Sequence, residues 1–371
     1  MNRDAAVRPE RAISEVLVQI ARGQQVCVPA TLRGDPDGLL HALRYHRLAP
    51  LAHVLLRDTE PVLARRLKSD RDRAITVHLC ATEMLRQFAD LTADIPWVVF
   101  KGPVLSELAH PVPGLRDYQD LDLLVAPSDL RRVSERLLDA GWSVLDYDDM
   151  LTAPQVAGEM HWRSPAGLQV DLHWTMINTQ RRRKHLSVPT GALLQRRVPV
   201  QLGFARAWTL APGDALLHVC THAALTGGNK LLYLVDAQHS SAQVNDWPEL
   251  ARRARAWQVG PHLSLVLHRA RRALGGQVPT GLDRMLGLTP AFRAVTGLVD
   301  AVAPVSQARQ EPGIARLVAR AVAPGAARTV AASARSVTRY LRHQQSARPT
   351  DRVTAGNAAL QEYLTRVETA D

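Results

Sequence analysis

Three aspartates, Asp120, Asp122 and Asp171, are the residues of this chain best placed to do chemistry, because each lies among apolar neighbours. Asp120 and Asp122 begin the run Asp-Leu-Asp-Leu-Leu-Val, which favours a strand, and side chains two apart on a strand share a face. Asp171 lies in a second such run, 169–174, where His173 shares its face. Carboxylates gathered on one sheet surface need cations nearby, and such hard oxygen ligands suit Mg²⁺ or Mn²⁺. The pattern predicts a metal site that bridges substrate phosphates.

Lys101 and Gly102 fit the same chemistry, because they stand between an apolar run, 97–100, and Pro103, which can begin a helix. Free backbone N–H groups and the dipole at a helix start favour a phosphate. An Asp-x-Asp strand alone occurs in many unrelated proteins. More specific than that strand alone is the full order of elements along the chain: a strand, Lys-Gly, a helix, the Asp-x-Asp strand, a helix and the strand of Asp171. His173 could contact the phosphate-bearing substrate or only form hydrogen bonds in the core, and the sequence does not decide between the two.

The elements that must position these residues form a small core, which we place at 93–210. Short β-rich runs predict strands at 97–100, 120–125, 142–147 and 169–174, and two more within 198–210. A helix is expected from Pro103 to about 109, and another after Ser128, which can cap it, ending at Gly141. Strands alternating with helices indicate a small α/β or α+β unit. The basic run 181–184 is either a solvated loop or a contact for a polyanionic substrate.

Helical regions flank this core. In the N-terminal region, 1–92, a short amphipathic run over 39–49 precedes a helix that Pro50 starts, and a long amphipathic helix follows at 62–91. The C-terminal region, 211–300, predicts helices at 214–225, 230–241 and 247–258, the last with Asp246 and Glu249 in capping-box spacing. The tail, 301–371, is rich in Ala and Arg, so we expect basic helices with a frayed end.

The net charge is +11, and most of it comes from arginine, since lysine occurs only at 68, 101, 184 and 230. This charge reflects either compositional bias or an attraction for polyanions such as nucleotides and RNA. Three widely spaced cysteines without a CxxC motif fit a reducing compartment. The N-terminus lacks the apolar segment of a signal peptide, and no apolar run has membrane-spanning length. We therefore expect a cytoplasmic protein without membrane association.

His218 and His222 lie four apart on a predicted helix and share a face. Zinc binding is conceivable, but no glutamate stands between them, so helix packing beside the active site is preferred. Asp236 is either an ordinary helix residue or one that reaches the cleft from the C-terminal region. The sequence has no P-loop, no Gly-x-Gly-x-x-Gly motif and no convincing nucleophilic triad.

Several segments resemble the uncharacterised nucleotidyltransferase family of the DNA polymerase β-like superfamily. They are Phe100-Lys-Gly-Pro-Val-Leu, Pro113-Gly-Leu-Arg116, Asp120-Leu-Asp-Leu-Leu-Val, Leu138-Asp-Ala-Gly-Trp142 and Val170-Asp-Leu-His-Trp174. Weaker likeness at 43–51 and 216–236 extends the resemblance over roughly 35–290, which leaves the basic tail outside it.

The resemblance implies an α+β fold, a small mixed sheet flanked by helical regions, that transfers a nucleoside monophosphate from an NTP such as ATP to an acceptor. Asp120 and Asp122 would bind both metal ions, and Asp171 would bind the catalytic metal and help deprotonate the acceptor. Lys101, Gly102, Arg116 and His173 would serve the nucleotide: the lysine and glycine hold the triphosphate, the arginine neutralises it, and the histidine stays a candidate contact. Such family members often belong to bacterial biosynthetic pathways, so a small-molecule or peptide acceptor is preferred over tRNA or protein.

Two departures from the superfamily pattern keep a second hypothesis open. The usual Gly-Ser after the first strand is Lys101-Gly102-Pro103 here, and Gln119 beside Asp120 is bulkier than the usual small residue. The alternative is therefore a catalytically degenerate nucleotidyltransferase fold that binds RNA or protein.

Overall fold

A mixed β-sheet lies at the centre of the protein, whose computed structural model describes residues 9–146, 149–305, 314–322, 353–354 and 357–369. The described strands follow the order β6-β7-β1-β2-β5-β4-β3-β8 across the sheet. Their bounds are β1 Trp97–Phe100, β2 Asp120–Val125, β3 Ser143–Asp146, β4 Glu159–Arg163, β5 Gln169–His173, β6 Val198–Leu202, β7 Ala205–Thr209 and β8 Val353–Thr354. The expected α+β class, a mixed sheet with helices before and after it, is confirmed.

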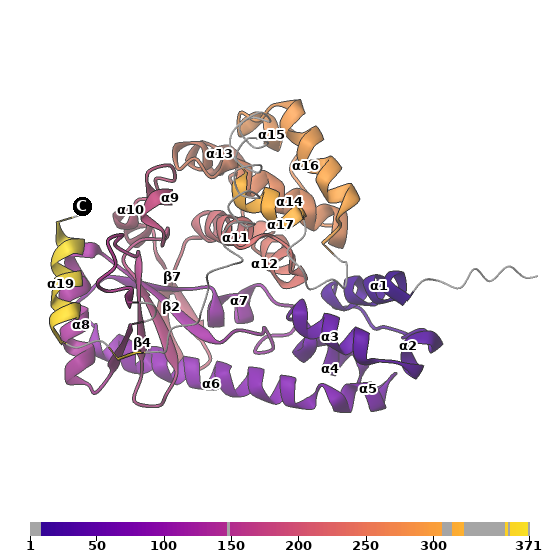
Figure 1. Cartoon of the computed structure of the whole chain (residues 1–371), viewed down its shortest axis with the longest axis horizontal. Helices are drawn as coiled ribbons and strands as arrows, with labels where there is room; N and C mark the ends of the chain where they lie inside the picture. Colours follow the sequence, from indigo (N-terminus) through magenta and orange to yellow (C-terminus); the bar gives the residue numbers. More distant parts are fainter. Residues whose placement is uncertain (1–8, 147–148, 306–313, 323–352, 355–356, 370–371) are drawn as a thin grey trace, which may run out of the picture.

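The helices fall into groups before, within and after the sheet (Figure 1). Those before it are α1 Pro9–Ala21, α2 Ala30–Gly34, α3 Asp37–Tyr45, α4 Ala49–Leu56, α5 Pro61–Arg66 and α6 Lys68–Leu91. Those between strands are α7 Gly102–Leu108, the 3₁₀ turn η1 Pro127–Asp129, α8 Leu130–Asp139, α9 Gln180–Arg183 and α10 Thr190–Gln195. Those after β7 are α11 Pro212–Thr226, α12 Leu231–Ser241, α13 Trp247–Ala256, α14 Gly260–Leu274, α15 Leu282–Met285, α16 Pro290–Val302, α17 Ile314–Ala321 and α19 Asn357–Glu368.

The two faces of the sheet belong to different hydrophobic cores, because side chains alternate along each strand. Val98, Phe100 and Leu124 face a core shared by helices α1 to α5 and those from α11 to α17. Val99 and Leu123 face a second core, which α6, α8 and α19 complete. The N-terminal and C-terminal helical regions therefore pack together on one side of the sheet, and the proposed domain boundaries at 92, 210 and 300 stay a prediction.

Local sequence signals explain several element starts. The side chain of Asp246 accepts a hydrogen bond from the backbone N–H of Glu249 at 2.9 Å, so the predicted N-cap of α13 is confirmed. Pro103 and Pro212 occupy first-turn positions of α7 and α11, where a missing N–H costs nothing. Gly141 has φ +80 and ends the turn after α8, as expected.

Two expectations from the sequence were wrong, and one strand was not expected. Ser128 does not cap α8, because residues 127–129 form a 3₁₀ turn and α8 starts at Leu130 without a side-chain cap. The expected single helix at 62–91 is two helices, with Leu67 between them. The sequence analysis also missed β4, whose polar residues Glu159, His161 and Arg163 alternate with apolar ones.

The expectation of a frayed C-terminus was also wrong. Helix α19 packs on the sheet and buries Leu360, Tyr363 and Leu364. The Tyr363 hydroxyl donates to the backbone oxygen of Ala157 at 2.7 Å and accepts a hydrogen bond from Trp174 Nε1 at 2.9 Å. Much of the rest of the tail lies outside the described residues. No helix in the described part of the chain is both long and apolar enough to cross a membrane.

Candidate active site

The strand register brings the three predicted aspartates together. Strands β2 and β5 are parallel neighbours, and Asp122 pairs directly with Asp171. Asp120 lies two residues before Asp122, so its side chain emerges on the same face. All three line one cavity of about 410 Å³ between the sheet and the helices, and Lys101 and His173 line it too. The predicted convergence of Asp120, Asp122, Asp171, Lys101 and His173 is thus present in the structure.

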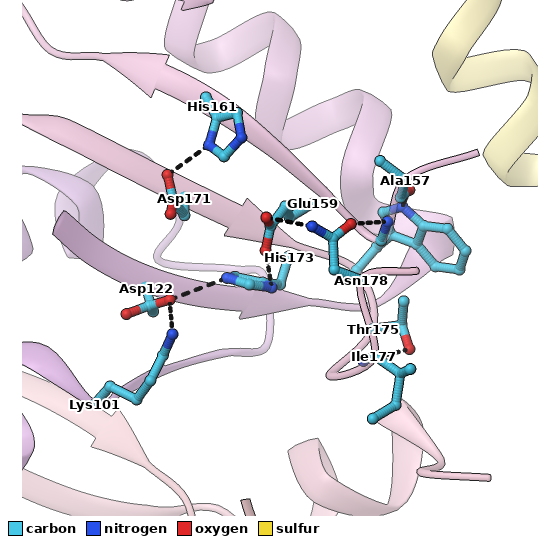
Figure 2. A network of polar contacts seen from close by, with 12 residues as sticks. Lys101, Asp122, Ala157, Glu159, His161, Asp171, His173, Thr175, Ile177 and Asn178 are labelled. Atoms are coloured by element: carbon cyan, nitrogen blue, oxygen red, sulfur yellow. Dashed lines mark hydrogen bonds and ion pairs between the residues drawn. The ribbon is translucent and has the colours of Figure 1, made fainter. Parts of the chain in front are cut away.

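Lys101 enters the cavity from a strained backbone. It follows β1 and has φ 58 and ψ −137, a conformation that residues with a side chain rarely adopt. Its Nζ lies 2.5 Å from Asp122 Oδ1 (Figure 2). Burial works against the charged ammonium, but Asp122 and Asp120 outweigh it and raise the pKa of Lys101. Lys101 is therefore a partly buried cation whose first partner is Asp122.

Gly102 makes this approach sterically feasible. Its φ is +26, and a Cβ at this position would lie 3.2 Å from the backbone oxygen of Asp120 and 3.4 Å from the Tyr118 ring. A side chain here would push the Lys101 turn away from β2. Gly102 itself does not line the cavity, so its place in the structure supports a positioning role.

The three carboxylates lie in unequal electrostatic surroundings. For Asp122, burial favours the neutral form, but Lys101 and His173 prevail and lower its pKa. The pKa of Asp120 is raised, first by burial and then by the charges of Asp122 and Asp171. A half-buried carboxylate with a raised pKa beside like charges is a position where an added cation is stabilised.

The carboxylate oxygens of Asp120, Asp122 and Asp171 are hard ligands that fit the divalent cation expected from the sequence. Three carboxylates line the cavity, and the charges of Asp122 and Asp171 add to burial in raising the pKa of Asp120, against the opposing charge of Lys101. Among the described residues, no three His, Cys, Asp or Glu side chains are already close enough to hold a metal ion. Asp120, Asp122 and Asp171, which line the same cavity, would be its ligands.

A polar network behind the aspartates was missed by the sequence analysis (Figure 2). His173 Nε2 lies 3.1 Å from Asp122 Oδ1, and its Nδ1 lies 3.2 Å from Glu159 Oε2. Burial works against its protonation, but Glu159 and Asp122 raise the pKa of His173. Asn178 Nδ2 donates to Glu159 Oε1 at 2.5 Å. His173 therefore links two carboxylates of the site.

Asp171 has a histidine partner of its own. His161 on β4 pairs across the sheet with Asp171, and its Nδ1 lies 2.7 Å from Asp171 Oδ1. Gln169 Nε2 donates to the same oxygen at 3.1 Å. The alternating pattern of β4, Glu-Met-His-Trp-Arg, is the signal that could have identified both Glu159 and His161.

Arg116 lies elsewhere and does not line the cavity. Its guanidinium forms a bidentate ion pair with Asp236 on α12, at 2.9 and 2.8 Å, and both side chains are buried. This pair joins the loop before β2 to the C-terminal helices. Asp236, which the sequence left between two roles, is thus the partner of Arg116.

His218 and His222 line the cavity as neighbouring rings, with centroids 6.0 Å apart. Phe100 packs edge-on against His218. Burial and the charge of Lys101 lower the pKa of His218 to about 3, and they lower that of His222 as well. Neutral, ring-packed histidines agree with the expected packing role beside the active site.

The basic run 181–184 divides into two roles. Arg182 lines the cavity, together with Arg316 and Arg320 from α17. Arg183 points elsewhere: it donates to the backbone oxygens of Val156, Ile177 and Asn178, and its guanidinium lies 4.7 Å from the Trp174 ring centroid.

Comparison with known proteins gives one finding on identity. The model of a family described as uncharacterised nucleotidyltransferase matches residues 33–275, well over half of the chain. The match runs from the N-terminal helices to α14 and includes the aspartates, Lys101 and Arg182, but it ends before α17. No curated protein matches the chain.

Proposed function

Because this chain belongs to the uncharacterised nucleotidyltransferases, we propose that it moves a nucleoside monophosphate from an NTP to an acceptor, with Mg²⁺ or Mn²⁺ bound by Asp120, Asp122 and Asp171. One observation carries the proposal. Three carboxylates from two adjacent parallel strands share the wall of a single cavity that also holds Lys101. A cavity of this size is in the range that small ligands occupy.

A divalent cation on these carboxylates would polarise the α-phosphate and stabilise the pyrophosphate that leaves. In the proposed reaction an acceptor hydroxyl oxygen bonds to the α-phosphorus, and the bond from that phosphorus to the pyrophosphate oxygen breaks. Asp171 takes the hydroxyl proton. His161 and Gln169 hold one Asp171 oxygen in place, which leaves the other free for this task.

Lys101 and His173 keep the site charged in this proposal. Both lie within 3.1 Å of Asp122 Oδ1, so the buried carboxylate stays ionised at neutral pH. Gly102 lets the Lys101 turn lie against β2. Arg116, which the resemblance assigns to the triphosphate, has a positioning role here through its pair with Asp236.

The acceptor class follows from the family resemblance: a small molecule or peptide of a bacterial biosynthetic pathway, in preference to tRNA or protein. The test of the function does not need the acceptor. Thermal unfolding is measured with each of four NTPs, with and without Mg²⁺ or Mn²⁺, for wild type and for Asp120→Asn/Asp122→Asn. Ligand at a hundredfold over its dissociation constant stabilises the folded state by about 2.7 kcal/mol. Metal-dependent stabilisation that the double variant lacks is expected; stabilisation that the variant keeps would contradict the assignment.

A second function, a degenerate binding module for RNA or protein, is favoured by one contact. Lys101 Nζ lies 2.5 Å from Asp122 Oδ1 and so uses a lone pair that a metal ion requires. This alternative predicts salt-sensitive RNA binding that survives loss of all three aspartates. Binding that requires both metal and the aspartates would exclude it.

A further inference from the structure

Part of the cavity wall is strongly basic. Arg182 comes from α9, and Arg316 and Arg320 come from α17, which packs against α11 on the helical side of the sheet (Figure 1). These three arginines line the same cavity as the acidic strand residues. We call them the arginine cluster.

The arginine cluster has no carboxylate to balance it. Among the described residues, none of its three guanidinium groups forms an ion pair with Asp or Glu. Arg316 Nε is buried without a hydrogen-bond partner in that part of the chain, and Arg320 Nε donates to the backbone oxygen of Leu225 at 3.2 Å. By contrast, the structural arginines Arg116, Arg253 and Arg269 each pair with an aspartate.

The members of the cluster also repel one another. Burial and the charge of Arg320 lower the pKa of Arg182, and burial and the charge of Arg316 lower that of Arg320. Arg182 and Arg316 are half-buried, whereas Arg320 is exposed. Partly desolvated cations without an opposite charge are stabilised when an anion joins them. The geometry therefore implies a ligand with several negative charges.

The arginine cluster is the part of the cavity best suited to bind phosphate groups, because Lys101 already pairs with Asp122. Helix α7, which follows Lys101, has only seven residues, so its N-terminus alone offers little positive charge to a phosphate. Guanidinium forks match phosphate oxygens in two-point contacts, and arginine is the preferred residue for them. A chain of linked phosphates can reach from an acidic, metal-binding wall to a basic one.

On this geometry, and resting on the proposed function, we propose that Arg182, Arg316 and Arg320 form a polyphosphate subsite that binds the β- and γ-phosphates of the NTP. The family match ends at residue 275, so α17 adds two of the three arginines from outside the matched region. The subsite therefore makes triphosphate recognition depend on a segment that lies outside the matched residues 33–275.

The test begins with tripolyphosphate alone, titrated calorimetrically in the presence of EDTA. Wild type binds it, and Arg182→Ala and Arg316→Ala/Arg320→Ala each weaken binding about 10- to 100-fold, as expected for lost charge-assisted hydrogen bonds. Arg316→Lys/Arg320→Lys keeps the charge but loses the fork, so its affinity falls less. The matched control is Arg57→Ala/Arg252→Ala, which removes two charges that are 70% and 65% exposed and leaves affinity unchanged.

Nucleotides then identify the source of the phosphates. Each of the four NTPs and its monophosphate is titrated with Mg²⁺, and the cluster variants lose affinity for the NTP while affinity for the monophosphate is kept. Tripolyphosphate competes with the NTP for wild type. Equal weakening of NTP and monophosphate, simultaneous binding of tripolyphosphate and NTP, or full tripolyphosphate affinity in both cluster variants would overturn the proposal. Absence of tripolyphosphate binding to wild type would overturn it as well.

Failure of this subsite and failure of the proposed function give different results. If the aspartate double variant loses metal-dependent NTP binding while the cluster variants keep theirs, the function stands and the subsite is wrong. If tripolyphosphate binding depends on the cluster but no NTP binding depends on the aspartates, the subsite stands and the transferase proposal is wrong. Arg182 lies on α9, so Arg182→Ala tests the subsite even if substitutions on α17 loosen that helix.

Discussion

Loss of either partner of the Arg116–Asp236 ion pair should lower the folding stability by several kcal/mol, because the remaining charge would be buried and unpaired. Their side chains are 7% and 2% exposed, and two hydrogen bonds of 2.9 and 2.8 Å join them. Removing one partner of such a pair costs about 3–5 kcal/mol. We therefore expect Asp236→Ala and Arg116→Ala each to lower the free energy of unfolding by that amount, measured by urea denaturation in EDTA.

The double replacement Arg116→Met/Asp236→Leu removes both charges together and should recover most of the loss, since apolar pairs of similar volume often replace buried ion pairs at little cost. Exposed Arg66 and Asp37, 2.7 Å apart, supply the control, and Arg66→Ala should cost at most about 1 kcal/mol. The reasoning is refuted if Asp236→Ala costs as little as the control. If Arg116→Met/Asp236→Leu folds normally, it should keep its NTP affinity, because Arg116 does not line the cavity.

Three further predictions concern single positions. Gly102→Ala should cost roughly 1–2 kcal/mol of stability and also weaken metal-dependent NTP binding, because φ is +26 and the new Cβ would lie close to the backbone oxygen of Asp120. Gly167→Ala is the control, with φ +84 and open space around it. It should lower the melting temperature without changing NTP affinity. Burial and then the charge of Arg182 lower the pKa of His262 to about 4. Between pH 6.5 and 4, therefore, the unfolded chain binds a proton at this histidine and the folded chain does not. Stability conferred by this neutral histidine is present above pH 6.5 and is lost as the pH falls, and His262→Leu should reduce the loss between pH 7.5 and 4 by up to ~3 kcal/mol in urea titrations; an unchanged pH slope would contradict this. Tyr363→Phe should cost about 1–2 kcal/mol and Tyr363→Ala about 3–5 kcal/mol in the same assay, and no loss in either would show that α19 does not stabilise the sheet.

The sequence predicted those parts of the site that depend on local pattern. A period of two along 120–125 placed Asp120 and Asp122 on one face, and apolar neighbours marked the strand of Asp171. The pairing of Asp122 with Asp171 depends on strand order, which local pattern does not contain. The family resemblance implied only that these aspartates share a metal site. The surrounding helices were largely predicted from apolar spacing and prolines.

Other features depend on contacts between distant segments, and a single sequence does not show them. Asp236 is 120 residues from Arg116, so its role as a partner could not be inferred from spacing. Helix α19 places its apolar residues in the core on one face of the sheet, and Tyr363 forms hydrogen bonds with Ala157 and Trp174. The composition of the tail had indicated an exposed end instead. Arg316 reaches the cavity through the packing of α17 on α11.

The central claim is that Asp120, Asp122 and Asp171 hold a divalent cation together with an NTP. Mn²⁺ binding, followed by electron paramagnetic resonance as loss of the free-ion signal, tests it most directly. Wild type should bind Mn²⁺ more tightly in the presence of an NTP, and Asp120→Asn/Asp122→Asn and Asp171→Asn should abolish that gain while remaining folded. Equal NTP-dependent Mn²⁺ binding by wild type and the folded variants would contradict the account and place the metal elsewhere.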